Sequence, residues 1–287
     1  MNKTQKMIPI EKLHPFENHP YKVQDNEEME LLAESIRQNG LLAPIVVRPL
    51  ENTTDEYEII SGHRRIMASQ KAGITEVPAF VVSLDRNAAA IALVDSNLHR
   101  EHILPSEKAF AYKLKLEAMR RQGLRTDLTS DQVGRKLETA EIIGEDTGES
   151  KNQIRRYIRL TNLIPGILQK VDEGRIAFTP AVELSYLTTA EQEALLEAME
   201  SEDCTPSLSQ AVQMKKLSQG GELDEDRIYT IMSQPKANQQ ERISFKVSDL
   251  REFFPKHYTG AQMMEEMLLA LKERRQRLAR MRNRDAR

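Results

Sequence analysis

Residues 57–72 read Tyr57-Glu58-Ile59-Ile60-Ser61-Gly62-His63-Arg64-Arg65-Ile66-Met67-Ala68-Ser69-Gln70-Lys71-Ala72. The stretch begins as an apolar, strand-like run and continues as a helix-like run, with Gly62 at the junction. A glycine at such a turn lets the backbone approach a ligand closely, and the helix behind it presents unpaired N–H groups and a partial positive charge. Arg64 and Arg65 add fixed charge and paired donors, so this turn suits a phosphate group.

The same residues also fit a plain turn followed by a solvated basic face, because short motifs often match by chance. A second motif, Asp95-Ser96-Asn97-Leu98-His99-Arg100, favours the phosphate interpretation. Asn97 and Arg100 are three residues apart, so on a helix they share a face. We therefore expect a helix that carries an amide and a guanidinium on one side and closes over a bound nucleotide.

The composition sets broad limits. A length of 287 residues indicates about two domains, or three small ones. The formal net charge of -3 excludes a uniformly basic protein but not a local basic surface. The longest apolar run, residues 88–94, is far too short to cross a bilayer, and the first residues lack the apolar core of a signal peptide. Cys204 is the only cysteine, which excludes an intrachain disulfide. We expect a cytoplasmic protein without membrane contact.

The pattern of apolar residues predicts an α+β fold that is mostly helical. Residues 1–100 alternate short strands (7–10, 45–47, 57–60 and 77–82) with helices (25–38, 66–72 and 87–98), which indicates a small α/β domain. We expect the helix over 25–38 to begin with a capping box of Asp25 and Glu28 and to stop at Gly40. From Ser106 onward the pattern is helical.

Two capping-box patterns in the middle of the chain predict a helix-turn-helix. Thr129 with Gln132 begins one short helix, and Ser150 with Gln153 begins another. The segment between them, residues 138–149, is longer than the usual tight turn and has room for an extra helical turn at residues 140–143.

The second of these helices has the features of a DNA-recognition helix. Lys151, Arg155 and Arg159 are spaced by four, so they form one basic stripe, and Arg156 adds a further charge. Asn152 and Gln153 stand at the helix start, where recognition residues meet base edges. Amide side chains can read adenine, and arginines can read guanine or grip phosphates. A solvated helix face is the alternative, but caps, apolar spacing and charge together favour DNA binding.

The last third is predicted to continue as helices over 163–217, followed by a polar linker at 218–226. An alternating strand is expected at 242–247 and a helix from Gly260. That helix has an apolar stripe that suits a core or a dimer seam, formed by Met263, Met264, Met267, Leu268 and Leu271. Residues 272–287 are strongly basic, which suits nonspecific contact with phosphates.

Several boxes, in this order and spacing, resemble the ParB family of plasmid and chromosome partition proteins. They are Asn18-His19-Pro20-Tyr21-Lys22, Leu32-Ala33-Glu34-Ser35-Ile36-Arg37-Gln38-Asn39-Gly40-Leu41-Leu42-Ala43-Pro44-Ile45-Val46-Val47-Arg48, Gly62-His63-Arg64-Arg65, Asn97-Leu98-His99-Arg100 and Leu104-Pro105-Ser106-Glu107-Lys108-Ala109. The resemblance implies a nucleotide-binding domain at 1–104, a helix-turn-helix domain at 105–217, a linker at 218–226, and a small α/β dimerisation domain at 227–287 with a basic tail.

Family members bind and hydrolyse CTP, and close around DNA as a clamp to support plasmid or chromosome segregation. The resemblance implies a nucleotide site made by Gly62, His63, Arg64, Arg65, Asn97, His99 and Arg100, with Mg²⁺ held near Asn97 and Asp95. It implies a DNA-binding surface made by Thr129, Ser150, Lys151, Asn152, Gln153, Arg155, Arg156 and Arg159. The implied partners are double-stranded DNA, a second copy in a homodimer and a ParA-type ATPase. The expected location is the nucleoid or a plasmid.

Two positions depart from the family. The chain has His63 and Ser96 where members usually have glutamate, and a hard cation prefers carboxylate oxygen. CTP hydrolysis is therefore expected to be weak or absent. A second hypothesis follows from the same residues: a DNA-binding regulator on this fold that has lost nucleotide switching. A third is a kinase or nuclease with a similar N-terminal domain, in which His63 would act as general base.

Overall fold

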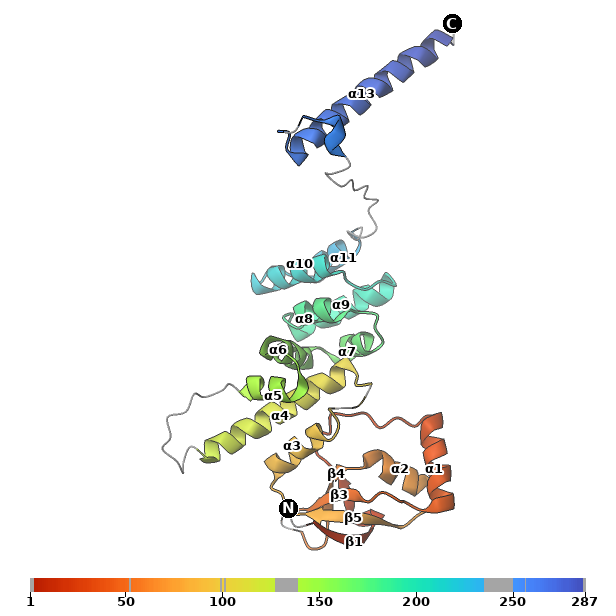
Figure 1. The fold of residues 1–287 in the computed structure, drawn as a ribbon, viewed down its shortest axis with the longest axis vertical. Helices are drawn as coiled ribbons and strands as arrows, with labels where there is room; N and C mark the ends of the chain where they lie inside the picture. Colours follow the sequence, from red (N-terminus) through yellow and green to blue (C-terminus); the bar gives the residue numbers. More distant parts are fainter. Residues whose placement is uncertain are drawn as a thin grey trace. The chain divides into compact units, whose positions relative to one another are not determined.

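The computed structural model describes residues 3–51, 53–98, 100, 102–126, 139–234, 250–255 and 257–285. The chain divides into two compact units, Met1–Gln234 and Pro235–Arg287. The first unit combines one five-stranded sheet with a succession of helices (Figure 1). The expected fold class, α+β and mostly helical, is thereby confirmed.

The sheet consists of β1 (Lys3–Pro9), β2 (Leu13–Pro15), β3 (Ile45–Pro49), β4 (Tyr57–Ser61) and β5 (Glu76–Val82). Its order is β1-β5-β3-β4-β2, with β1 antiparallel to β5, β3 antiparallel to β4, and the β2–β4 and β3–β5 pairs parallel. A short 3₁₀ turn, Ile10–Lys12, joins β1 to β2. One core of the unit is built from buried apolar residues of these strands, among them Ile8, Ile45, Val47, Ile59 and Val77.

Helices α1 (Glu27–Asn39) and α2 (His63–Lys71) pack against each other through Met29, Ala33, Ile36 and Ala68. The cap predicted for α1 was wrong by one residue. The side chain of Asn26, not Asp25, accepts a hydrogen bond from the Met29 N–H, because Asn26 is the last residue with extended backbone. Gly40 ends the helix at a φ of 69°, as its position predicted.

Helix α3 (Arg86–Asp95) ends earlier than expected. We predicted a helix to residue 98 that would carry Asn97 and Arg100 on one face, and this was wrong. The Ser96 hydroxyl and the Asn97 amide both donate to the Leu93 carbonyl. Such local side-chain bonds compete with the backbone ladder and favour a turn. Asn97 and Arg100 therefore lie in the turn after α3, where the Arg100 N–H donates to the Asn97 carbonyl.

The described residues from 105 to 234 are mainly helical. Their helices are α4 (Pro105–Thr126), α5 (Thr139–Thr147), α6 (Lys151–Arg159), the 3₁₀ turn Leu160–Asn162, α7 (Pro165–Asp172), α8 (Phe178–Leu184), α9 (Thr189–Ser201), α10 (Leu208–Gln219) and α11 (Glu225–Met232). Figure 1 shows α4 lying between α3 and the α5–α6 pair, with α7 to α11 stacked beyond them. Apolar side chains of α7 to α11 form a second core, which includes Ile167, Leu184, Leu195, Met214 and Ile228.

The helix-turn-helix within the described residues is α5 and α6. The helix expected to start at Thr129 lies outside the described residues, and the extra turn expected at 140–143 is part of α5, a full helix. The connection to α6 is short, since Glu149 donates its N–H back to the Gly144 carbonyl. Ser150 caps α6 by accepting from the Gln153 N–H, as predicted.

The polar stretch at 218–226 is not an extended linker. It contains the end of α10 and the start of α11, and α11 buries Ile228, Ile231 and Met232 in the same core as α10. The first unit therefore continues to Gln234.

The second unit contains the 3₁₀ turn Arg251–Phe253 and α13 (Gly260–Asp285). The strand expected at 242–247 lies outside the described residues. In α13 Met263 is buried, whereas Met264, Leu268, Leu269 and Leu271 are about half exposed.

Candidate functional site

The turn between β4 and α2 has the geometry that an anion site requires. Gly62 caps α2 with a φ of 111°, in the left-handed region that glycine adopts without strain. A Cβ atom at this position would lie 2.7 Å from Cγ2 of Ile45. The turn is therefore open to glycine alone, and it leaves the first N–H groups of α2 without partners inside the helix.

A pocket of about 260 Å³ lies over this turn. It is lined by His19, Tyr21, Lys22, Val23, Ser61, Gly62, His63, Arg64, Arg65, Asn97 and Arg100. A neighbouring pocket of about 500 Å³ shares Lys22, Arg64 and Arg100 with it and is also lined by Gln24, Asn26, Glu28, His102, Leu104 and Glu107. The structure thus brings together six of the seven residues expected at a nucleotide site; the seventh, His99, lies outside the described residues.

The two arginines of the turn already have partners. Arg65 Nη1 donates to the carbonyls of Ala43 and Pro44, each at 2.7 Å. Burial lowers the pKa of the Arg65 guanidinium from its ordinary value. Arg64 reaches α1, where its Nη2 lies 3.1 Å from Oε2 of Glu28. Arg65 therefore tightens the loop before β3, and Arg64 sits at the boundary of the two pockets.

His63 is held as a neutral imidazole. Its Nε2 accepts a hydrogen bond from the Phe16 N–H at 3.4 Å, so in the neutral ring the proton lies on Nδ1. Burial, together with the nearby His19, lowers the pKa of His63 to about 3. Because its Nε2 is occupied and its pKa is far below neutrality, His63 is poorly suited to act as the general base of a kinase or nuclease.

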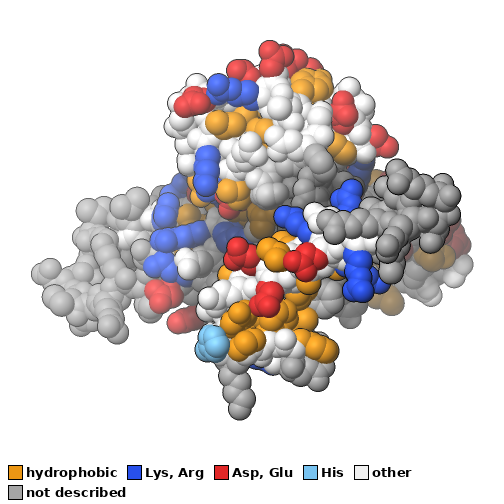
Figure 2. All heavy atoms as spheres, turned by 90° about the horizontal axis from the view of Figure 1, so that it is seen from above, with side chains coloured by type: hydrophobic (Ala, Val, Ile, Leu, Met, Phe, Trp, Pro, Cys, Tyr) orange, Lys and Arg blue, Asp and Glu red, His pale blue; other side chains and the backbone are white. Residues whose placement is uncertain are grey.

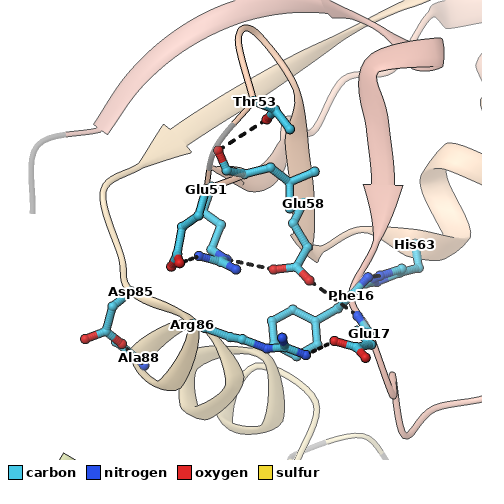
Figure 3. A network of polar contacts seen from close by, with 11 residues as sticks. Phe16, Glu17, Glu51, Thr53, Glu58, His63, Asp85, Arg86 and Ala88 are labelled. Carbon is cyan, nitrogen blue, oxygen red and sulfur yellow. Dashed lines mark hydrogen bonds and ion pairs between the residues drawn. The ribbon is translucent and has the colours of Figure 1, made fainter.

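The backbone partner of His63 is itself fixed to the sheet. Glu58 accepts the Glu17 N–H at 3.3 Å and forms a buried ion pair with Arg48 at 2.7 Å. Glu17 also pairs with Arg86 at the start of α3. Figure 3 shows this network running from Glu51 and Glu58 to Phe16 and His63. It holds the segment after β2 in place beneath the pocket.

The two residues expected to hold Mg²⁺, Asp95 and Asn97, both already have protein partners. Oδ1 of Asp95 lies 2.7 Å from Nζ of Lys115, on the side of α4. Asn97 lines the pocket, but its amide group donates to the Leu93 carbonyl and the Ser96 hydroxyl. Asn97 thus offers one amide oxygen, and Asp95 offers a carboxylate that a cation already holds. Among the described residues, no group of three or more His, Cys, Asp or Glu side chains could hold a metal ion.

Sequence reasoning missed the wall formed by residues 19–23. His19 Nδ1 lies 2.8 Å from the Tyr21 carbonyl, and the His19 ring contacts the His63 ring at a tilt of 43°. The Lys22 N–H donates to Glu107, and its Nζ lies 2.9 Å from Asp172 at the end of α7. The box Asn18-His19-Pro20-Tyr21-Lys22 was a signal for this wall, but its side chains gave no sign that they would meet Gly62.

The second candidate surface is the outer side of α6. Ile154 is fully buried against α4 and α5, which directs the opposite side of the helix outward. Asn152 and Arg155 are exposed, and Lys151 is partly exposed. Thr129 lies outside the described residues. Figure 2 shows Lys and Arg side chains interspersed with Asp and Glu side chains over the face that it draws.

The other two arginines of α6 turn toward α8. Arg156 contacts Gln153 and the Thr179 hydroxyl, and its guanidinium lies 4.9 Å from the Phe178 ring. Arg159 lies 3.3 Å from the Tyr186 ring and donates to the Ser185 carbonyl. The expected stripe of Lys151, Arg155 and Arg159 is thus divided: its first two residues face outward, and Arg159 packs on the neighbouring helix.

These features define a class: a helix-turn-helix protein whose N-terminal α/β part carries a cationic pocket at a glycine turn. Residues 1–98 match the family model described as the ParB N-terminal domain. The chromosome-partitioning protein Spo0J of Thermus thermophilus is 35% identical over 170 residues, which cover 59% of this chain and 55% of that protein. The nucleoid occlusion protein of Listeria innocua is 33% identical over 190 residues, covering 66% of this chain and 60% of that protein.

Residues 1–98 therefore match a ParB N-terminal domain, and the chain is similar to proteins named for chromosome partitioning and nucleoid occlusion. It spans only 55% and 60% of the length of these two curated relatives. A solved structure of C-terminally truncated ParB from Caulobacter crescentus complexed with CTP-gamma-S is 27% identical, with a TM-score of 0.32, and covers 69% of this chain and 99% of that one.

No helix among the described residues is both long and apolar enough to cross a membrane.

Proposed function

We propose that this chain is a DNA-binding partition protein whose hold on DNA is controlled by bound CTP. The observation that carries the proposal is that one compact unit contains both a cationic pocket at a glycine turn and a capped helix-turn-helix. The names of the relatives, chromosome-partitioning and nucleoid occlusion proteins, support a role at the chromosome. The choice of cytosine as the base rests on the family resemblance.

The pocket has the charge that a triphosphate requires. Lys22, Arg64, Arg65 and Arg100 contribute cationic side chains, and no Asp or Glu is among the described residues that line it. The N-terminus of α2 adds its partial positive charge. Arginine also matches the bidentate geometry of phosphate oxygens. We infer that the phosphates lie between Gly62 and Arg100.

The side chains themselves, and not a metal held by Asp95, provide most of the phosphate binding in this proposal. Lys115 already pairs with one oxygen of Asp95, and Asn97 can offer its amide oxygen to an ion that arrives with the nucleotide. Replacing Mg²⁺ with EDTA should then change the affinity for CTP by less than about tenfold, or ~1.4 kcal/mol. Isothermal titration in the two buffers measures this, and a complete loss of binding in EDTA would contradict it.

The DNA would be read from α6, with Asn152 at the helix start and Lys151 and Arg155 beside it. Arginine and lysine contacts to phosphates position such a helix, and contacts with base edges select the sequence. The half-exposed apolar residues of α13 support a homodimer, because a stripe of this kind is expected to pack on a second copy. Two pockets and two readers would then enclose one duplex. A ParA-type ATPase as partner remains a prediction from the resemblance.

Titration of the full chain with CTP, ATP, GTP and UTP tests the nucleotide step. We expect a preference for CTP, and a loss of it in Arg65→Ala. Arg121→Ala is the matched control, because Arg121 is an exposed arginine of α4 far along the chain from the glycine turn. Equal affinity for CTP and ATP would contradict the proposal.

Crosslinking tests the clamp. Single cysteines at exposed N-terminal positions, such as Leu31 and Leu42, would be introduced in a Cys204→Ser background. We expect crosslinked dimers to increase only when CTP and DNA are both present. Crosslinking that does not depend on CTP would show that the N-terminal parts do not close in response to CTP.

A specific contact favours a second candidate, a regulator on the same fold without a nucleotide switch. Arg65 Nη1 already bonds to two carbonyls, so Arg65 could serve the loop before β3 alone. In that case Arg65→Ala would lower the stability of the fold. DNA binding would be insensitive to CTP both in this variant and in the unmodified chain.

A further inference from the structure

Lys115 is a buried lysine that the proposed function does not use. It lies in the middle of α4 and only 1% of its surface is exposed. Lysines are almost never buried to this degree unless they are paired. Lys115 meets that condition with two partners, since its Nζ lies 2.7 Å from Oδ1 of Asp95 and 2.7 Å from Oδ2 of Asp146.

The two partners come from different parts of the unit. Asp95 is the last residue of α3, beside the nucleotide pocket, and Asp146 lies near the end of α5, the first described helix of the helix-turn-helix. Figure 1 shows α4 running between these two helices. One ammonium group therefore connects the pocket side to the DNA-reading side through α4.

Asp95 is coupled to the pocket by the chain itself. Asn97, two residues further on, lines the pocket, and both Ser96 and Asn97 bond to the Leu93 carbonyl in the last turn of α3. A displacement of Asn97 toward a ligand would consequently pull on the end of α3 and on Asp95.

The three groups differ in how easily they can be released. The side chains of Asp95 and Asp146 are 48% and 53% exposed, so water can solvate either carboxylate if it leaves. The buried ammonium has no such alternative and must keep a partner. Burial lowers the pKa of Lys115, but hydrogen bonds and charge from Asp146 and Asp95 more than reverse this, so its net shift is upward and it stays protonated. Asp95, Lys115 and Asp146 thus form a bridge in which either carboxylate can leave while the ammonium group of Lys115 stays in place.

Among the described residues, Lys108, another lysine of α4, makes an ion pair with the helix-turn-helix only. Lys108 pairs with Glu149 at 2.7 Å, in the turn between α5 and α6, and so also ties α4 to the helix-turn-helix. Its Nζ also lies 5.2 Å from the ring centroid of Tyr157 in α6, so both of these contacts are with the helix-turn-helix. Lys108 thus supports the reader without reaching the pocket side, which makes it the control for Lys115.

We propose that Lys115 is the positioning residue that transmits the state of the nucleotide pocket to the DNA-reading helices, because it holds Asp95 and Asp146 together. This role of Lys115 rests on the proposed function. It predicts that CTP binding alters the α5–α6 pair through the end of α3. A coupling of this kind typically changes the affinity of one ligand about 5- to 150-fold when the other is bound, and the effect is reciprocal.

Hydrogen exchange on the full chain tests the bridge. Exchange of the amides in residues 139–159 would be followed with and without saturating CTP in the unmodified chain, Lys115→Met and Lys108→Met. Methionine keeps most of the buried volume and removes the charge. We expect CTP to change exchange in this segment in the unmodified chain and in Lys108→Met, but not in Lys115→Met, while titration shows that Lys115→Met binds CTP with an affinity within about tenfold of normal.

Asp146→Asn provides a second test in case Lys115→Met does not fold. It leaves the Lys115–Asp95 pair intact and weakens only the arm to α5, so it should also lose the response to CTP. A response of normal size in either folded variant would overturn the role of Lys115. A chain that binds no CTP at all would instead overturn the proposed function, and the bridge would fall with it.

Discussion

The rings of His19 and His63 contact each other in the wall of the cationic pocket, with centroids 3.8 Å apart and planes tilted by 43°. His19 Nδ1 donates to the Tyr21 carbonyl, and His63 Nε2 accepts from the Phe16 N–H. Burial is the main reason that the pKa of each ring is lowered, to about 3 for His63. Both rings are therefore neutral in the folded protein near pH 7, and protonation of either would place a charge against the other.

This pair predicts that the fold becomes less stable in mild acid. The unfolded chain takes up a proton at His63 as the pH falls below its ordinary pKa of 6.5, whereas the folded chain does not until about pH 3. Stability is thus unaffected above pH 6.5 and decreases below it, by about 2 kcal/mol at pH 5 for His63. Urea unfolding at pH 7 and pH 5 measures this difference.

His63→Gln is the matched variant, because glutamine can still accept from the Phe16 N–H but does not titrate. The loss between pH 7 and pH 5 should shrink in this variant. An equal loss in both proteins would show that other groups cause the acid sensitivity.

The glycines at the two ends of α2 make a second prediction. Gly62 and Gly73 both have positive φ, 111° and 77°, but a Cβ meets Ile45 at 2.7 Å only at Gly62, and nothing within 4 Å at Gly73. Gly73→Ala should destabilise the protein by about 1–2 kcal/mol from backbone strain alone. Gly62→Ala should add roughly 1–3 kcal/mol from overpacking and weaken CTP binding. Urea unfolding and titration of both variants compare them, and similar effects would mean that the turn is not specially tight.

The turn of the helix-turn-helix gives a third prediction. A Cβ on Gly144 would lie 2.4 Å from the Glu149 carbonyl oxygen, a backbone atom that cannot easily move. Gly144→Ala should therefore separate α5 from α6 and destabilise the protein by roughly 1–3 kcal/mol, with weaker DNA binding. Gly123→Ala is the control, since nothing lies within 4 Å and alanine favours a helix by about 0.5–1 kcal/mol. Circular dichroism melts and DNA titrations would reveal the contrast.

The face of α6 gives a fourth prediction, which separates affinity from sequence reading. Arg155→Ala should weaken binding to all duplexes alike and reduce the slope of log affinity against log salt by about 1, because one phosphate contact is lost. Asn152→Ala should instead reduce discrimination between sequences by about 1–3 kcal/mol at one base pair. Arg175→Ala, in the connection after α7, is the control. Binding assays over a salt series distinguish these effects, and an unchanged slope in Arg155→Ala would place that arginine away from the DNA backbone.

Local signals were reliable where neighbouring residues decide the structure. The strand, Gly62 and the helix after it could be predicted because the turn depends on one backbone angle and on adjacent apolar runs. The Ser150 cap was predictable for the same reason, since its partner, the Gln153 N–H, is three residues away. The end of α3 was misjudged because Ser96 and Asn97 can either continue a helix or bond back to Leu93, and the apolar pattern does not distinguish these outcomes.

The sequence by itself determined the strand–glycine–helix turn, the capped basic helix and the fold class, because each depends on residues close together in the chain. Only the tertiary structure decided which way the charged side chains point: Arg65 toward Ala43, Arg159 toward Tyr186, and Asp95 toward Lys115. These choices join segments 20 or more residues apart. Packing between elements selects among partners of the same charge and reach, and no spacing along the chain carries that information.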